Sequence, residues 1–324
     1  MSAPLLSMAA SDAAARAQVL RRLELAIAHR LEGRESGDHA SYAYGPGSER
    51  SGARPYAPGD DARLVDWNLT ARSGQVWVRQ TEADRELETW VVVDRSASLD
   101  FGTATCEKRD VALGAMAAFG MLTLRGGNRF GVLVAGTDRL RHVPARRGRT
   151  AFLASLAAVY DAPRQPGAPG NGATVADALR RLTVVQPRRS QVVVVSDFLG
   201  DDAWADALSR VVRHHDVVAV HVTDPRELTL PDVGVLAVVD TETGRQRYVH
   251  SASPGLRARY AAAAAARHRA IVSRIEGAGA TYLHLSTDRD WLADTVQFAA
   301  RARRARRARP SDAVIARFTP VVPR

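Results

Sequence analysis

Three segments of the sequence carry oxygen-bearing side chains at intervals suited to a metal site. They are Asp94, Ser96 and Ser98 in one run, Thr174 at the end of the Gly-rich stretch 167–174, and the pair Ser196-Asp197. Carboxylates and hydroxyls, with no His or Cys among them, are hard donors that suit Mg²⁺ or Mn²⁺ rather than Zn²⁺. Because Mg²⁺ prefers six oxygens, this set would leave at least one position open to an incoming carboxylate.

Helix capping is the competing interpretation of the same residues. Hydroxyl and carboxylate side chains satisfy the free amides at helix N-termini, and Thr174 and Asp197 each precede a predicted helix. Each segment taken alone favours capping. Their coincidence at strand ends or adjoining loops of one sheet favours a metal site.

Apolar patterning predicts the elements that would position these segments. Strands are expected at 89–93, 129–136, 191–195, 216–222 and 280–285. Helices are expected at 107–124, 149–160, 174–184, 201–213 and 255–276. Hairpins are expected at 129–143 and at 235–250, the second with its turn at Thr243-Gly244. Continuous apolar strands separated by helices predict an α/β fold with a doubly wound, mostly parallel sheet and helices on both faces. Ligands bind such sheets beyond the carboxyl ends of the strands, where the three segments lie.

The chain is predicted to have an N-terminal extension, one α/β domain and a basic tail. Residues 1–86 form the extension, which we expect to pack on the domain of residues 87–300, with an Arg-rich helix end and tail at 301–324. The extension opens with a helix at 14–32, whose apolar face holds Leu20, Leu23, Ile27 and Leu31. Loops with one short hairpin follow to about residue 58, then a short helix from Asp60 or Asp61 and a strand at 76–79.

Acidic, basic and aromatic residues alternate within the extension. They are Arg54, Tyr56, Asp60, Asp61, Arg63, Asp66, Trp67 and Arg72. One hypothesis makes this block a partner-docking surface close to the metal site. The other makes it an ion-paired strap in which Trp67 anchors the extension, and the alternation of acids with arginines favours this strap.

Composition excludes several classes of protein. The 324 residues carry a net charge of +10, but residues 301–309 contribute six arginines, so the remainder is only mildly basic. Only one of the 45 basic Lys and Arg residues is a lysine, Lys108, and Cys106 is the only cysteine, which excludes an intrachain disulfide. With no signal peptide and no apolar run long enough to span a membrane, we expect a cytoplasmic protein without membrane insertion.

The sequence also lacks the usual signatures of hydrolases and NTPases. It has neither a Gly-x-Ser-x-Gly elbow nor a P-loop, and its histidines show no metal-ligand spacing. The arginine tail is expected to be a solvated helix end. Contact with an acidic partner or with nucleic acid is an alternative, although no aromatic residue or recognition motif accompanies the tail.

The order of these motifs resembles a known family. An Asp-x-Ser-x-Ser run, a Thr in a Gly-rich loop and an Asp after an apolar strand resemble the metal-ion-dependent adhesion site of von Willebrand factor A domains. The stretch RPYAPGDDARLVDWNLTARSGQVWVRQTEADRE at 54–86 is similar to the signature of the domain of unknown function 58 family. DPRELTLPDVG at 224–234, DTETG at 240–244 and STDRD at 286–290 agree with it, and the likeness extends over about residues 18–305.

The resemblance implies a fold, a ligand set and a partner. It implies a von Willebrand A-like fold in which Asp94, Ser96, Ser98, Thr174 and Asp197 coordinate Mg²⁺ or Mn²⁺. Leu99 and Asn128 depart from residues common in the family, at positions outside this ligand set. Members often lie beside genes for MoxR-type AAA+ ATPases in bacterial gene clusters, which implies an adaptor role with such an ATPase or with a client that exposes Asp or Glu.

Three functions follow as hypotheses. The first is a non-enzymatic protein-interaction module whose metal binds a partner carboxylate. The second is a metal-dependent phosphohydrolase with Asp94 as nucleophile, for which Arg95 and Lys108 could hold the phosphate, although Ser96 stands where a second acid is wanted. The third is non-specific nucleic-acid binding through the tail. The sequence favours the first.

Overall fold

The computed structural model describes most of the chain as two compact units. The described residues are 13–35, 50–58, 60–81, 88–125, 127–163, 172–239 and 245–308. The larger unit comprises the first helix and everything from the third strand onward, and the smaller one lies within residues 35–86.

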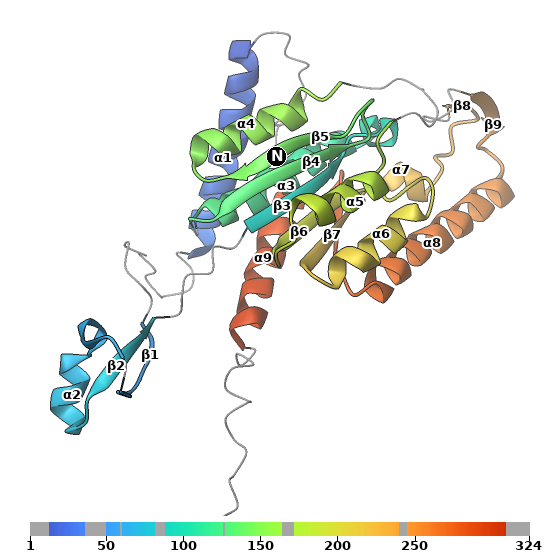
Figure 1. The fold of residues 1–324 in the computed structure, drawn as a ribbon. Helices are drawn as coiled ribbons and strands as arrows, with labels where there is room; N and C mark the ends of the chain where they lie inside the picture. Colours follow the sequence, from blue (N-terminus) through green and yellow to red (C-terminus); the bar gives the residue numbers. More distant parts are fainter. Residues whose placement is uncertain are drawn as a thin grey trace, which may run out of the picture. The chain divides into compact units, whose positions relative to one another are not determined.

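The larger unit is built on a six-stranded sheet (Figure 1). Its strands are β3 (Glu88–Asp94), β4 (Arg129–Ala135), β5 (Arg141–Arg146), β6 (Gln191–Ser196), β7 (Asp216–Thr223) and β10 (Thr281–Ser286). They follow the order β10-β7-β6-β3-β4-β5. All neighbours are parallel except β5, which is antiparallel to β4. The predicted fold class, a mostly parallel doubly wound sheet, is therefore confirmed.

Helices cover both faces of this sheet (Figure 1). One face packs against α1 (Ala13–Glu35), α3 (Lys108–Arg125), α4 (Arg149–Tyr160) and α9 (Trp291–Ala308), and the other against α5 (Val175–Val185), α6 (Ala203–Val212) and α8 (Pro254–Gly277). Alternate residues of β3 enter the two cores, with Val91 and Val93 in one and Trp90 and Val92 in the other. The strands are continuously apolar because both of their faces are buried.

The order of the strands reverses between β3 and β6. From β3 the chain builds outward through β4 to β5, and from β6 it builds in the opposite direction through β7 to β10. The connections after β3 and β6 therefore leave the sheet in opposite directions, and doubly wound sheets bind ligands at the carboxyl ends of the strands at such a point.

Shorter elements complete the larger unit. They are the 3₁₀ turn η2 (Ala97–Asp100), the one-turn helix α7 (Pro225–Leu228), and the antiparallel strands β8 (Val235–Val239) and β9 (Gln246–His250). The hairpin predicted at 235–250 is confirmed, while its predicted turn at Thr243-Gly244 lies outside the described residues. Within the described parts of the chain, no helix combines the length and apolarity needed to cross a bilayer.

The smaller unit differs from its prediction in its short helix. Strand β1 (Arg50–Pro55) pairs antiparallel with β2 (Trp77–Thr81), and most of the stretch in which the short hairpin is predicted lies outside the described residues. The single short helix is in fact two elements, η1 (Ala62–Leu64) and α2 (Trp67–Ser73). The chain is extended between them because Asp66 caps α2, accepting hydrogen bonds from the amides of Asn68 and Leu69.

Candidate functional site

Two carboxylates lie at the carboxyl ends of the two strands between which the strand order reverses. Asp94 ends β3 and Asp197 follows β6, and these strands are parallel neighbours with Val93 paired to Val195. Both side chains are buried. The fold thus brings together the first and third of the segments singled out in the sequence.

The Asp94 carboxylate is held by neutral donors. Its Oδ1 accepts a hydrogen bond from the Ser96 amide at 2.8 Å, and its Oδ2 accepts one from the Ser196 hydroxyl at 2.6 Å. Burial, and then the nearby charge of Asp197, raise the pKa of Asp94 above its ordinary value, despite these hydrogen bonds. Asp94 is thus a buried acid whose negative charge lacks full compensation, and a cation would supply it.

The two serines after Asp94 have the spacing of neighbouring metal ligands. Their hydroxyl oxygens lie 3.0 Å apart at the start of the turn η2 and share a hydrogen bond. Two ligands at a right angle and about 2.1 Å from one Mg²⁺ ion are about 3.0 Å apart, so both hydroxyls can occupy one edge of an octahedron. With the carboxylate of Asp94 beside them, the donor set of Asp94, Ser96 and Ser98 fits a hard divalent ion.

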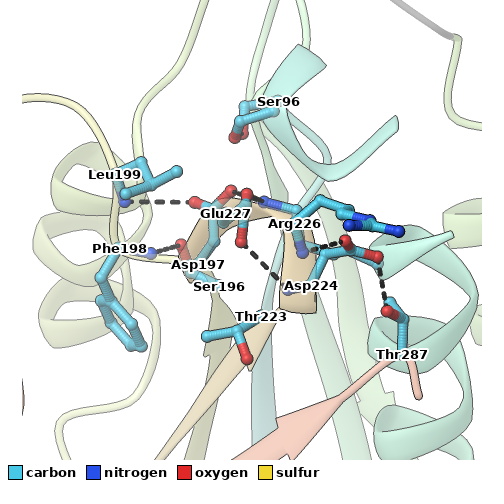
Figure 2. Close-up of polar contacts among 12 residues, drawn as sticks. Ser96, Ser196, Asp197, Phe198, Leu199, Thr223, Asp224, Arg226, Glu227 and Thr287 are labelled. Carbon is cyan, nitrogen blue, oxygen red and sulfur yellow. Dashed lines mark hydrogen bonds and ion pairs between the residues drawn. The ribbon is translucent and has the colours of Figure 1, made fainter. Parts of the chain in front are cut away.

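Asp197 is paired with a buried lysine. The Lys108 ammonium lies 2.7 Å from Asp197 Oδ2 and also binds the Glu227 carboxylate, and the Leu199 amide donates to Asp197 Oδ1 at 3.1 Å (Figure 2). Burial opposes the ionisation of Asp197, but the charge of Lys108 and its hydrogen bond lower the pKa of Asp197 below the ordinary value. Asp197 is therefore held as a carboxylate.

The same contacts also shift the pKa values of Lys108 and Glu227. Burial alone would lower the pKa of Lys108, but Asp197 and Glu227 outweigh it and raise that pKa. Burial raises the pKa of Glu227, and Lys108 opposes this change only in part. We call Asp94, Asp197, Glu227 and Lys108 the strand-end cluster.

Thr174 makes the contacts expected of a helix cap. Its hydroxyl accepts a hydrogen bond from the Asp177 amide, and its own amide donates one to the Asp177 carboxylate, which closes a capping box at the start of α5. The backbone next to it is tied to the site, because the Gly136 amide donates to Ala173 O. Gly136 in turn lies against Ser96 so closely that a Cβ would approach the Ser96 nitrogen to 2.1 Å. Thr174 as a ligand remains a prediction.

No group of three or more His, Cys, Asp or Glu side chains in the described part of the chain has the arrangement of a metal site. The predicted set has only two acids, Asp94 and Asp197, and takes its remaining donors from hydroxyls, as expected for Mg²⁺ or Mn²⁺. A site with more carboxylates or with imidazole ligands finds no support here.

Sequence reasoning missed the partners of the cluster. Lys108 was considered only as a phosphate ligand, and Glu227 was not considered at all. Both left a signal: Lys108 is the only lysine in the chain, and Asp224-Pro-Arg-Glu227 has the spacing of a capping box. The structure contains that box, with the Asp224 amide donating to Glu227 Oε2 (Figure 2).

A group of histidines lies beside the cluster, at positions where the sequence predicts packing or surface roles. His221 of β7 pairs in register with His284 of β10, and both rings lie against His268 of α8, with ring centroids 5.1 to 6.0 Å apart. Burial, followed by the two neighbouring histidines, lowers the pKa of His221 to about 3. His221 is therefore neutral and structural at physiological pH.

Acids of the alternating block in the smaller unit accept local hydrogen bonds, and two of them cap helices. Asp60 accepts from the Ala57 amide, Asp61 from the Arg63 amide, and Asp66 caps α2. Trp67, the predicted anchor, is 70% exposed. The predicted roles of this block as a strap or a docking surface stay open as predictions.

Comparison with known proteins places the chain in a family. The family model described as "Protein of unknown function DUF58" matches residues 52–271. The chain belongs to the DUF58 family. Its relatives include the uncharacterized proteins Mb1516 of Mycobacterium bovis and Rv1480 of Mycobacterium tuberculosis, each 50% identical over 290 residues, which cover 89% of this DUF58 protein and 90% of each relative.

Solved structures are more distant. BatB from Bacteroides thetaiotaomicron matches 67% of this DUF58 protein and 99% of its own chain, with a TM-score of 0.41 and 12% identity. The VWA domain of SpRpn10 matches 65% and 94%, with a TM-score of 0.38 and 13% identity. The fold assignment rests on the sheet order described above.

Proposed function

We propose that this DUF58 protein is a non-enzymatic protein-interaction module that binds a partner carboxylate through a divalent ion at the strand ends. The observation that carries the proposal is the donor set of Asp94, Ser96 and Ser98, because it pairs a buried, uncompensated carboxylate with two hydroxyls at octahedral spacing. Mg²⁺ or Mn²⁺ bound there would supply a Lewis acid with open positions. The chain's own residues orient the donors, through the hydrogen bonds that hold the Asp94 carboxylate.

The resemblance stated above supplies the partner class. A MoxR-type AAA+ ATPase, or a client with an exposed Asp or Glu, would present the carboxylate. Interaction with such a partner would serve the assembly or maturation of a complex.

The contacts of Lys108 weigh against the phosphohydrolase alternative. A phosphoryl-transfer site needs a free cation to hold the phosphate oxygens, whereas the Lys108 ammonium already binds two carboxylates. Arg95 is buried beside α3 and donates to the Arg109 carbonyl. The nucleic-acid alternative concerns the arginine tail, of whose six arginine side chains only Arg301 is described.

Calorimetric titration of Mn²⁺ and Mg²⁺ into the full chain tests the proposal. We expect saturable binding by the wild type, and none by Asp94→Ala. Asp216→Ala is the matched control, because it removes one acid at the opposite end of the same sheet and should bind as the wild type does. Failure of the wild type to bind either ion would overturn the metal site.

Partner binding is measured with a purified MoxR-type ATPase by biolayer interferometry, with Mg²⁺ or with a chelator. The complex should require both the ion and Asp94. Binding that survives both chelation and Asp94→Ala would show that the partner uses another surface.

A further inference from the structure

The position of Lys108 in the fold is unusual for a cation. It is the first residue of α3, where the aligned peptide dipoles disfavour positive charge. Its side chain is fully buried, although long basic side chains normally keep their charge in water. Helix stability therefore does not explain why a cation lies here, and its two carboxylate partners do.

The choice of lysine over arginine points the same way. This chain uses arginine at all its other basic positions, including many that form surface ion pairs. An ammonium is a compact charge with three donors that can bridge two carboxylates inside a closed space, whereas a guanidinium is a larger planar fork. Lys108 is buried, and its compact ammonium contacts both Asp197 and Glu227.

The formal charges of the strand-end cluster do not balance. When all three carboxyl groups are ionised, Asp94, Asp197 and Glu227 oppose a single ammonium and two negative charges remain, which equals the charge that a divalent ion would neutralise. Lys108 forms ion pairs with Asp197 and Glu227. The described hydrogen bonds of Asp94 come only from neutral donors. The cluster thus has two parts. In one, Asp197 and Glu227 bind the ammonium of Lys108, and in the other, Asp94 is available to a divalent ion.

We propose that Lys108 is the resident cation of this site and that Glu227, by sharing its ammonium with Asp197, sets the affinity of the site for a divalent ion. This inference rests on the proposed metal site and extends it to α7. Without the Glu227 charge, the ammonium belongs to Asp197 alone and the cluster is one charge less negative. Without the ammonium, the cluster is one charge more negative.

Opposite charge changes should therefore move metal affinity in opposite directions. Mn²⁺ alone is titrated calorimetrically into the wild type, Glu227→Gln, Lys108→Met and the double variant. A unit charge within the site changes the attraction for a divalent ion enough to alter the dissociation constant about tenfold or more. We expect about tenfold weaker binding by Glu227→Gln and about tenfold tighter binding by Lys108→Met. The double variant, whose net charge matches the wild type, should bind within about threefold of it.

Two controls separate charge from structure. The Glu227→Gln variant keeps a side-chain oxygen that can accept the Asp224 amide, so α7 remains capped. Asp216→Asn removes one charge at the other end of the sheet and should leave the affinity unchanged. Circular dichroism and melting temperature establish that each variant is folded, and if Lys108→Met is not, the Glu227→Gln measurement decides alone.

The outcomes distinguish this inference from the function on which it rests. Wild-type binding with Glu227→Gln unchanged or tighter would overturn the role of Lys108 and Glu227 and leave the metal site standing. Weakening by both single variants would show that Lys108 only supports the fold. No binding by the wild type would overturn the metal site itself, and this inference with it.

Discussion

Asp94 and Asp224 are both buried acids at the carboxyl end of the same sheet, yet their surroundings differ. Asp224, after β7, accepts four hydrogen bonds, from the amides of Thr103 and Arg226 and from the hydroxyls of Thr103 and Thr287. Burial would raise its pKa, but these donors lower it. Asp94 has fewer donors and a raised pKa.

The difference separates a structural carboxylate from a candidate ligand. Each oxygen of Asp224 accepts two hydrogen bonds, from groups in the loop before α3, in α7 and just after β10, so the residue ties three segments together. Figure 2 shows its contacts with Arg226 and Thr287. Asp94 retains acceptor capacity and lies beside two hydroxyls at metal-ligand spacing. Burial alone does not mark a functional acid, and what distinguishes one is charge left without compensation.

Removing the structural acid should have the largest effect. Asp224→Ala leaves two threonine hydroxyls and two amides without their acceptor in a buried site, and we expect it to lower the free energy of unfolding by about 3 kcal/mol. Urea denaturation followed by circular dichroism measures the loss. A loss below about 1 kcal/mol would mean that the contrast between the two acids is wrong.

His221 extends the comparison to a buried group that is held neutral. Its folded pKa of about 3 lies below the ordinary value of 6.5, so the unfolded chain binds more protons and the folded state loses stability as the pH falls below 6.5. The slope should reach about 1.4 kcal/mol per pH unit. Urea denaturation at about pH 7.5 and about pH 5.5 measures it. His221→Gln should show a smaller slope, and an equal slope would refute the assignment.

Neutralising the candidate ligand should cost little. Asp94→Asn removes an uncompensated buried charge, so without divalent ion its free energy of unfolding should equal that of the wild type or exceed it by up to about 1 kcal/mol. Mn²⁺ should raise the melting temperature of the wild type and not of this variant. A strong destabilisation would place Asp94 with Asp224 as a structural acid.

The smallest effect concerns Thr174. Thr174→Ala should lose about 0.5 kcal/mol through the missing cap, whereas Thr174→Ser retains it. If Thr174 only caps α5, both variants bind Mn²⁺ as the wild type does in calorimetry. If it is also a ligand, the alanine variant alone binds more weakly, which would extend the site to the loop before α5.

The sequence allowed the sheet and the three segments to be predicted, but not the contacts among them. An apolar run such as QVVVV predicts a strand by itself, because a strand buried on both faces must be apolar throughout. Lys108 reaches Asp197 and Glu227 across 89 and 119 residues, and no local pattern encodes such separations. The break between η1 and α2 was missed because the same aspartates fit several cap positions.

The outer strand β5 also limits how this protein can meet other chains. An edge strand normally offers a row of free amides and carbonyls on which a second sheet can grow. Here Pro144 removes one amide, arginines stand at both ends, and the register shifts between Phe130 and Val132 of the neighbouring strand. These features are the ones by which natural sheets resist templated self-association. On this side they disfavour growth of the sheet by strand addition.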